Sequence, residues 1–330
     1  MSLYPLTFQP IFKERVWGGR RLAELFQKNL PAGAVIGESW EITDRPEGVS
    51  VIAQGPLAGK DLRWLMTEHG REVLGREVAP GERFPWFIKL LDAQDDLSLQ
   101  VHPPASRAAE LKGEPKTELW YFADAQPGAK IYVGLRPGVD REELVHRIAD
   151  GSVANCFHVH ETQRGDVMFV PSGRVHALGG GNVVFEIQQN SDTTYRVFDW
   201  NRVGLDGRPR ELHLEASLAS IDFTDFQPAL VDSPRKRQGS GERRALVDHP
   251  LFQIDEVRLA CGQKLPDVRP ANRPAILGVV QGGLTVVGGG ETVSVRAGGF
   301  VLLPAALSNV EIRTDEASIL LRVTPPDEPS

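Results

Sequence analysis

The chain has 330 residues, of which 41% are apolar and 25% charged, values that exclude a wholly disordered, collagen-like or coiled-coil protein. The net charge of −7 argues against nucleic acid or an anionic membrane as a partner. The first residues lack a basic region followed by an apolar stretch, and no apolar run of about 18 residues occurs, so we expect neither export nor membrane insertion. The 33 glycines and 24 prolines favour turns between short strands, so we expect a mainly β protein. The only two cysteines, Cys156 and Cys261, lack the close spacing of a redox motif, which fits the reducing cytoplasm.

Along the chain, residues 1–80 combine short strand-like pieces with a helix predicted over 61–74, which Gly75 would end. From about residue 84, short apolar or alternating runs are separated by Asp, Gly and Pro, which is typical of antiparallel strands. These runs are 86–91, 97–102, 118–122, 166–170 and 183–188. Two further helices are predicted over 141–149 and 212–221.

A segment without large apolar residues divides the β-rich sequence. Residues 232–244 are polar, basic or glycine and predict a surface connection between domains. We therefore expect a domain over 1–231, which contains the helices, a linker over 232–244, and a smaller barrel over 245–330.

One strand–turn–strand pattern occurs twice. The spacing of glycine and proline in 165–176 is repeated in 298–309, but His176 in the first copy is replaced by Asn309 in the second. The repeat supports two similar domains, of which the second lacks this imidazole.

Four polar side chains form a candidate metal site. Gln100 and His102 lie two residues apart on a predicted strand and therefore face the same side. Glu118 begins another strand, and His176 follows a turn. Two imidazoles and a carboxylate suit Zn²⁺ or a related divalent ion, with an amide as a fourth ligand. Taken singly, Gln100 and Glu118 are better explained as strand residues without a ligand role, whereas His102 fits a hydrogen-bonded strand residue as well as a ligand.

Other features are interpreted as structural. His158 and His160 share a strand face, but no carboxylate follows at a ligand spacing. The glycine runs at 179–181 and 288–290 lack the context of a nucleotide-binding loop and predict hairpin turns. Most of the tryptophans are expected to fill the core.

The segment 165–176 resembles the second conserved motif of the cupin superfamily, whose barrels hold a metal with histidines and a carboxylate. A narrower similarity, covering most of residues 5–225, is to type I mannose-6-phosphate isomerases of the short bacterial form. The segments that carry it are Gly37-Glu38-Ser39-Trp40-Glu41, Gln100-Val101-His102-Pro103, Lys116-Thr117-Glu118 and Asn190-Ser191-Asp192-Thr193-Thr194-Tyr195-Arg196. The large helical insertion of longer family members has no counterpart here.

This resemblance implies two cupin barrels, of which the C-terminal one is degenerate and metal-free. It also implies reversible isomerisation of D-mannose 6-phosphate to D-fructose 6-phosphate, by metal-assisted proton transfer through an enediol, in a monomer or weak homodimer. One Zn²⁺ per chain would be held by Gln100, His102, Glu118 and His176, with Arg196, Lys116 and Asp192 as catalytic residues.

Several roles stay open. The proton-transfer base is Asp192, Lys116, a metal-bound water or another residue, whereas Arg196 is permanently charged and is assigned to electrostatic stabilisation. Two other functions are alternatives: a non-catalytic sugar-phosphate-binding cupin regulator, or a different cupin metalloenzyme. Candidate donors to the substrate phosphate are Arg15, Arg20, Lys89, Arg202 and Arg210.

Overall fold

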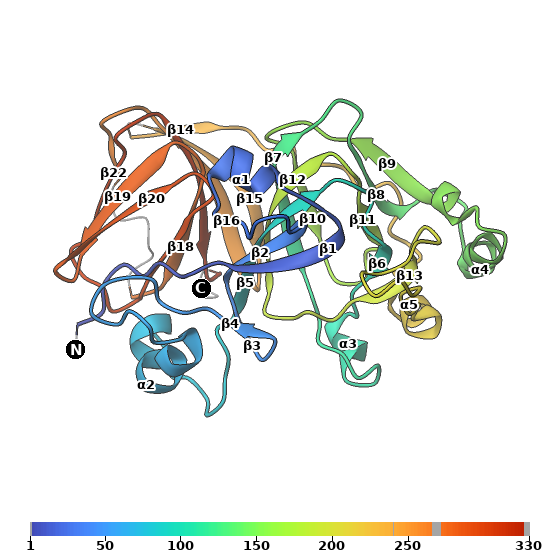
Figure 1. Cartoon of the computed structure of the whole chain (residues 1–330), viewed down its shortest axis with the longest axis horizontal. Coiled ribbons are helices and arrows are strands. Elements are labelled where there is room, and N and C mark those ends of the chain that lie inside the picture. The colour runs from blue at the N-terminus through green and yellow to red at the C-terminus, as the bar shows by residue number, and fades with distance from the viewer. Residues whose placement is uncertain (1, 240, 266–271, 327–330) are drawn as a thin grey trace.

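The computed structural model describes residues 2–239, 241–265 and 272–326. Strands dominate this part of the chain, as predicted, and form four larger sheets and one two-stranded ribbon. We number the larger sheets I to IV; they follow one another along the long axis of the molecule, from the side of α4 to the side of β19 (Figure 1).

The N-terminal part of the chain forms sheets I and II. In spatial order, sheet I contains β13 (Tyr195–Phe198), β6 (Leu99–Val101), β11 (His176–Leu178), β8 (Lys130–Leu135) and β9 (Phe157–Glu161). Sheet II contains β1 (Ile11–Gly19), β2 (Ile36–Ile42), β5 (Trp86–Ala93), β12 (Asn182–Gln189), β7 (Glu118–Ala125) and β10 (Val167–Val170). The short ribbon pairs β3 (Asp44–Arg45) with β4 (Gly48–Val49).

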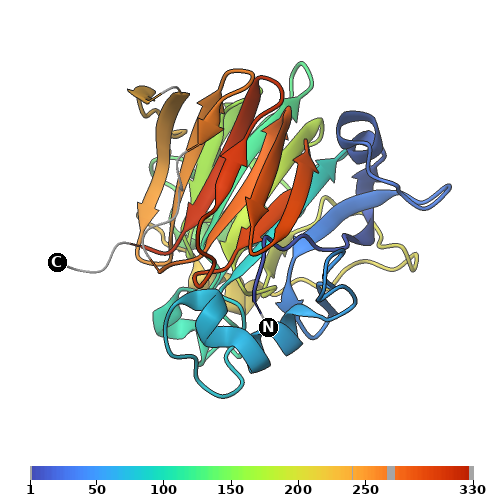
Figure 2. The same ribbon diagram turned by 90° about the vertical axis from the view of Figure 1, so that its left-hand side faces the viewer.

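The C-terminal part forms sheets III and IV, whose orange and red strands face the viewer in Figure 2. Sheet III contains β14 (Lys236–Gln238), β15 (Gly241–His249), β16 (Phe252–Leu259), β23 (Ser318–Thr324), β18 (Ala275–Gln281) and β21 (Phe300–Leu303). Sheet IV contains β17 (Lys264–Leu265), β22 (Glu311–Arg313), β19 (Gly283–Gly288) and β20 (Glu291–Arg296).

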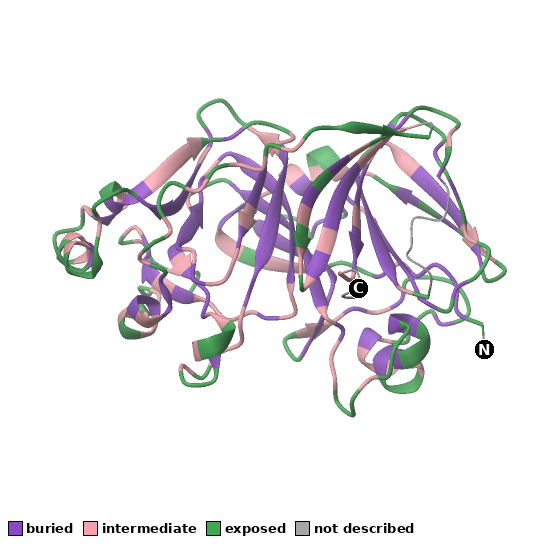
Figure 3. Cartoon of the chain, turned by 180° about the vertical axis from the view of Figure 1, so that it is seen from behind, coloured by how far each residue is buried: buried purple, intermediate pink, exposed green. Residues whose placement is uncertain are grey.

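The alternation of side chains along each strand separates the hydrophobic layers. In sheet II, Leu90 and Phe185 point toward sheet III and join a cluster that contains Ile254 and Leu321. The opposite face of sheet II packs against sheet I through a second cluster, whose members include Leu91, Trp120, Phe122, Ile131, Val133 and Leu178. A third cluster fills the space between sheets III and IV. Burial is accordingly concentrated on the strands (Figure 3).

The helices lie outside the sheets. They are α1 (Arg21–Phe26), α2 (Leu62–Leu74), α3 (Ala105–Ala108), α4 (Arg141–Ala149) and α5 (Leu214–Ser220), with a 3-10 helix over Val153–Cys156. The three predicted helices are confirmed as α2, α4 and α5. Asp61 caps α2 by accepting a hydrogen bond from the Trp64 N–H at 2.6 Å, and Gly75 ends it with a φ of 73°. No helix within the described residues has the length and apolar character needed to span a membrane.

The predicted connection at 232–244 is only partly as expected. Its described residues are mostly exposed, but they are not irregular, because 236–238 form β14 and residue 241 begins β15. These two strands pair with each other at the edge of sheet III. Backbone hydrogen bonding, together with the ion pairs of Arg235 with Glu256 and of Arg243 with Asp255, orders this segment, which has none of the apolar side chains that would predict a strand. Residue 240 lies outside the described part.

Candidate metal centre

The strand alternation that builds the cores also directs the polar side chains inward. On β6, Leu99 and Val101 belong to the cluster on the outer face of sheet I, so Gln100 between them faces sheet II. On β7, Leu119 belongs to the cluster shared with sheet III, so Glu118 faces sheet I. The two facing sheets therefore bring these polar groups into one interior space.

Strand register places the other side chains beside these two. His176 on β11 and Arg196 on β13 both lie opposite Gln100, on either side of β6. His102 follows β6 by one residue. The antiparallel pairing of three short strands thus gathers residues that lie up to 96 positions apart, from Gln100 to Arg196, at one end of sheet I.

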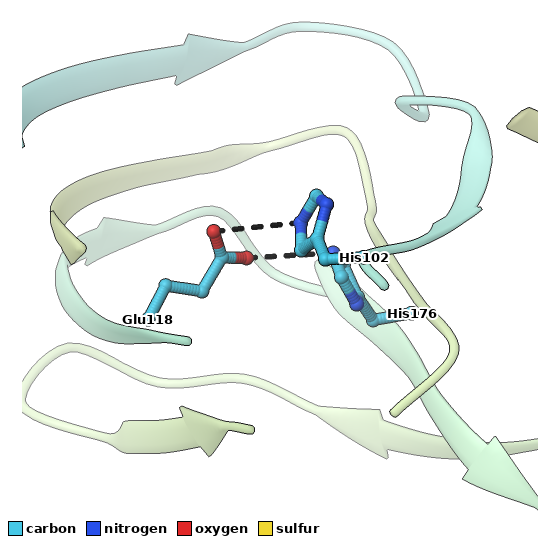
Figure 4. Close-up of side chains that lie close together, drawn as sticks. All are labelled: His102, Glu118 and His176. Atoms are coloured by element: carbon cyan, nitrogen blue, oxygen red, sulfur yellow. Dashed lines mark ion pairs between the residues drawn. The ribbon is translucent and has the colours of Figure 1, made fainter. Parts of the chain in front are cut away.

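His102, Glu118 and His176 converge on one point (Figure 4). Their potential ligand atoms all lie within 4.8 Å of one another. His102 Nε2 is 3.6 Å from Glu118 Oε2, and His176 Nε2 is 3.4 Å from Glu118 Oε1. The Gln100 amide lies 3.2 Å from His176 Nε2 and borders the same group. The four residues that the sequence motifs grouped therefore lie together in space.

A hydrogen bond from the other ring nitrogen orients each imidazole. The Nδ1–H of His102 donates to the Thr193 carbonyl at 2.8 Å, and that of His176 donates to the Arg174 carbonyl at 2.9 Å. Each Nε2 lone pair then faces the cluster. His102 Nε2 and Glu118 Oε1 are buried without a hydrogen-bond partner in the described part of the chain. Buried polar atoms without partners are costly, and a divalent cation at their centre would satisfy them. The donor set therefore fits a metal ion.

The electrostatics keep the three groups in the forms that bind a cation. Burial lowers the pKa of His176 to about 3 and also lowers the pKa of His102, so both imidazoles are neutral at pH 7. Burial alone would raise the pKa of Glu118, but the Lys116 ammonium beside it outweighs burial and holds this pKa well below its usual range. Two neutral imidazoles and one carboxylate suit a borderline ion such as Zn²⁺.

A cavity of about 540 Å³ adjoins the cluster. Gln100 and Lys116 line it, and both touch the cluster, since Lys116 Nζ lies 2.8 Å from Glu118 Oε2. Arg196 and Asp192 line the same cavity. All three residues predicted as catalytic are therefore present around one space.

A buried ion-pair network lines one wall of the cavity. Lys89 Nζ lies 3.3 Å from both Glu186 Oε2 and Asp192 Oδ1, and Trp120 Nε1–H donates to Glu186 Oε1 at 3.1 Å. Burial opposes the charge of Lys89, but Glu186 and Asp192 raise its pKa above the usual value. Asp192, one of the predicted catalytic residues, is thus held by Lys89.

Arg196 differs from the other cations of the cavity wall. Arg15 pairs with Glu38 at 2.7 Å, and Lys89 and Lys116 have the carboxylate partners described above. Within the described residues Arg196 has no carboxylate within 4 Å, its Nη1 donates to the Glu211 carbonyl, and its buried Nε has no partner. Its charge is therefore available to a ligand in the cavity.

Comparison with known proteins decides the family. Residues 6–132 match the family model for the catalytic domain of type I phosphomannose isomerase. Mannose-6-phosphate isomerase of Streptococcus mutans is 36% identical over 94% of this chain and 96% of its own length. ManA, a mannose-6-phosphate isomerase of Bacillus subtilis, is 34% identical over 94% and 96%. The chain belongs to the type I mannose-6-phosphate isomerase family. The resemblance inferred from the sequence motifs is thereby confirmed.

Solved structures of family members have the same fold. The crystal structure of mannose 6-phosphate isomerase from Bacillus subtilis matches 98% of this chain and 99% of its own, with a TM-score of 0.87 and 32% identity. A mutant of phosphomannose isomerase from Salmonella typhimurium matches 98% of this chain and 100% of its own, with a TM-score of 0.77 at 17% identity, which shows the shared fold alone.

Two cavity residues received no role from the sequence. Glu186 and Glu38 both lie in the cavity wall, and Glu38 also accepts a hydrogen bond from Trp40 Nε1 at 2.7 Å. A signal for Glu186 existed, because it is a charged residue inside an apolar run, as Lys89 is in another. Charged residues are rarely buried in a strand unless they are paired. Conversely, His158 and His160 lie outside the cluster, as expected, and His160 Nε2–H donates to the Pro228 carbonyl.

We expect the Glu38→Gln protein to be less stable than the wild type at pH 7 but not at pH 2. Burial would raise the pKa of Glu38, yet Lys89 and Arg15 lower it to about 2. Because this folded value lies below the unfolded one, the stabilisation is present above about pH 4.5 and is lost as the pH falls to 2. The shift corresponds to at most about 3.4 kcal/mol in the free energy of unfolding.

Urea denaturation at pH 7, 4 and 2 measures this difference. The Glu14→Gln protein is the matched control, because Glu14 is exposed on the neighbouring strand β1. A difference between Glu38→Gln and wild type that stays constant across this range would contradict the assignment.

Proposed function

We propose that this protein catalyses the reversible isomerisation of D-mannose 6-phosphate to D-fructose 6-phosphate. Membership of the type I mannose-6-phosphate isomerase family supports this reaction. The observation that carries the proposal is the buried cluster of His102, Glu118 and His176 beside a cavity that Arg196 also lines. The site thus combines a group that can bind a cation with the fixed positive charge of Arg196. The bound cation and the arginine would both stabilise negative charge on a substrate oxygen.

The proposed metal is one Zn²⁺ per chain, bound by Gln100, His102, Glu118 and His176. The burial and hydrogen bonding of the imidazoles support their part in this set, and Gln100 can present its amide oxygen or nitrogen by rotation about its terminal torsion. When bound, the ion would supply Lewis-acid polarisation of a substrate oxygen and help to orient the sugar.

The polar side chains around the cavity would complete the reaction. Aldose and ketose interconvert when a proton moves between C2 and C1 through an enediol, which places negative charge on oxygen. Arg196 would stabilise that charge, because it lines the cavity and has no competing carboxylate among the described residues. Lys116 and Asp192 would frame the reacting carbons, and the choice of base between them and other groups rests on experiment.

We also propose that the four sheets form two cupin barrels. Residues 1–231 would form the catalytic unit, 232–244 the connection and 245–330 a metal-free barrel. The pairing of sheet I with sheet II, and of sheet III with sheet IV, around separate cores supports this division. In the repeated motif, Gly165 and Gly298 both have φ between 79° and 89°, and Asn309 stands where the first copy has His176.

We also propose the binding partners, oligomeric state and cellular compartment of the protein. The sugar phosphates are its expected small-molecule partners, and the acidic charge argues against nucleic acid or membrane binding. A cytoplasmic monomer or weak homodimer is proposed, and the two unpaired cysteines, Cys156 and Cys261, are compatible with a reducing compartment.

A coupled assay that follows fructose 6-phosphate formation from mannose 6-phosphate tests the function. We expect turnover by the metal-replete protein, a loss of at least about a hundredfold after chelation, and recovery when Zn²⁺ is added back. Apo-protein that regains activity equally well with buffer alone would contradict a metal requirement. Tight sugar phosphate binding without any turnover would instead favour a non-catalytic regulator.

A further inference from the structure

The segment that follows β13 forms one side of the cavity. Residues 200–212, which we call the rim hairpin, fold back on themselves through an antiparallel bridge between Val203 and Pro209. The Gly204 N–H donates to the Arg208 carbonyl at 2.7 Å across the turn. Leu205 and Arg210 of this hairpin line the cavity, and Leu205 is 66% exposed. The hairpin leaves directly from the strand that carries Arg196.

A single buried carboxylate holds the base of the rim hairpin. Asp199 is 5% exposed and accepts hydrogen bonds from Arg210 Nε at 2.6 Å and Arg210 Nη2 at 2.5 Å, which is a bidentate arrangement. It also accepts a hydrogen bond from Arg202 Nε at 3.0 Å. Asp199 therefore fixes two arginines, one at each end of the hairpin.

The two arginines differ in which of their N–H groups remain free to bind a ligand. Arg202 donates from Nε to Asp199 and from Nη1 to the Asp96 carbonyl and the exposed Asp95 carboxylate, its Nη2 lies 2.9 Å from Asp199 Oδ1, and it does not line the cavity. Arg210 uses only the edge formed by Nε and Nη2. Its Nη1 has no hydrogen bond to any described residue, and its side chain lines the cavity. Arg210 can therefore bind an anion without breaking its pair with Asp199.

The other basic candidates are less free to do so. Arg20 donates to the Pro31 and Ala34 carbonyls away from the cavity. Arg15 and Lys89 line the cavity but are paired with Glu38 and with Glu186 and Asp192, respectively. Asp206, the carboxylate of the rim hairpin that lines the cavity, caps the turn by accepting from the Arg208 N–H.

We propose that Asp199 is a positioning residue that holds Arg210 toward the cavity, where Arg210 binds the phosphate group of the sugar substrate. This inference rests on the proposed function and specifies how the substrate phosphate is recognised. The phosphate on C6 is remote from the reacting C1 and C2, so it needs donors away from the metal ligands, and Arg210 contacts none of them. A guanidinium held by a carboxylate on one edge is preorganised to bind an oxyanion on the other.

Steady-state kinetics and inhibition by inorganic phosphate test the contact. We expect Arg210→Met to raise both KM for mannose 6-phosphate and the inhibition constant for phosphate by about 10- to 100-fold, with kcat changed less than about threefold. Methionine keeps the aliphatic part of the side chain. The matched control is Arg208→Met, which removes a charge from the same hairpin outside the cavity and leaves both constants unchanged. Constants within twofold of wild type in Arg210→Met would overturn the inference.

A double mutant tests the positioning role of Asp199. We expect Asp199→Asn, which keeps the side-chain size, to raise the same two constants by about 3- to 10-fold. The double mutant should have the same two constants as Arg210→Met alone, because Asp199 acts through Arg210. Additive effects, or a loss of kcat with unchanged phosphate inhibition, would overturn this role.

Calorimetry separates this inference from the proposed function. If the wild type has no isomerase activity, the proposed function fails, and the ratio of its affinities for mannose 6-phosphate and for mannose still measures phosphate recognition. A ratio that falls at least tenfold in Arg210→Met supports the inference, and an unchanged ratio contradicts it.

Discussion

The His176→Ala protein is expected to bind no zinc and to have at least about a thousandfold less isomerase activity than the wild type. His176 supplies one of only two imidazoles in the buried cluster, and its Nε2 lies 3.4 Å from Glu118 Oε1. Without it, the proposed ligand set would keep one imidazole, the Glu118 carboxylate and the neutral Gln100 amide, which is a weaker donor set for zinc. Elemental analysis of the purified protein measures zinc per chain, and the coupled assay measures activity.

The control for this prediction is His158→Ala. His158 lies in the same sheet, on β9, but outside the cluster. It should retain about one zinc per chain and full activity. Thermal unfolding of both variants distinguishes a local loss of metal from a general loss of structure, because His176 is fully buried. An unchanged zinc stoichiometry in His176→Ala would show that the ligand assignment is wrong.

The Arg196→Ala protein is expected to keep its zinc and to lose kcat by about 10²- to 10³-fold. Arg196 lies opposite Gln100 in the sheet and lines the cavity, yet it contacts none of the three clustered ligands. Its removal should therefore spare the metal site. Because its charge has no carboxylate partner among the described residues, the variant loses a group that is free to stabilise charge in the substrate.

Separate measurements of kcat, KM and zinc content define the outcome. Arg208→Ala, which removes an arginine outside the cavity, should behave as the wild type. If Arg196→Ala loses zinc together with activity, the residue supports the metal site instead. If KM alone rises, Arg196 contributes to substrate binding equally in ground and transition states.

The different zinc contents expected of these two variants follow from one feature of the fold. The sandwich of sheets I and II is filled by apolar side chains at one end and by charged groups at the other. His176 lies in the buried part of the polar end, and Arg196 lies on the cavity wall. The two residues therefore have different proposed roles. His176 and Arg196 both lie beside β6, but the proposed metal ligand His176 is fully buried, whereas Arg196, proposed to stabilise charge, lines the cavity.

Local sequence patterns were sufficient for many elements because the interactions that define them are local. The three predicted helices have side-chain periodicity and end signals within their own segments, and the strands have alternating or continuous apolar runs. The short strand inside 232–244 escaped prediction because its side chains show no such pattern. The polar β14 has no burial signal, and it exists because its backbone pairs with β15.

Residue patterns alone were enough to predict the mainly β architecture, the helices and the group of four candidate ligands, the last through motifs that resemble a known family. The three-dimensional arrangement was needed to find that Glu186 and Lys89 form a buried pair beside the cluster and that Arg210, but not Arg202, lines the cavity while paired with Asp199. These features depend on which side chains meet across two sheets and on how each arginine's donors are shared. Neither the spacing of residues along a strand nor their chemical type contains that information.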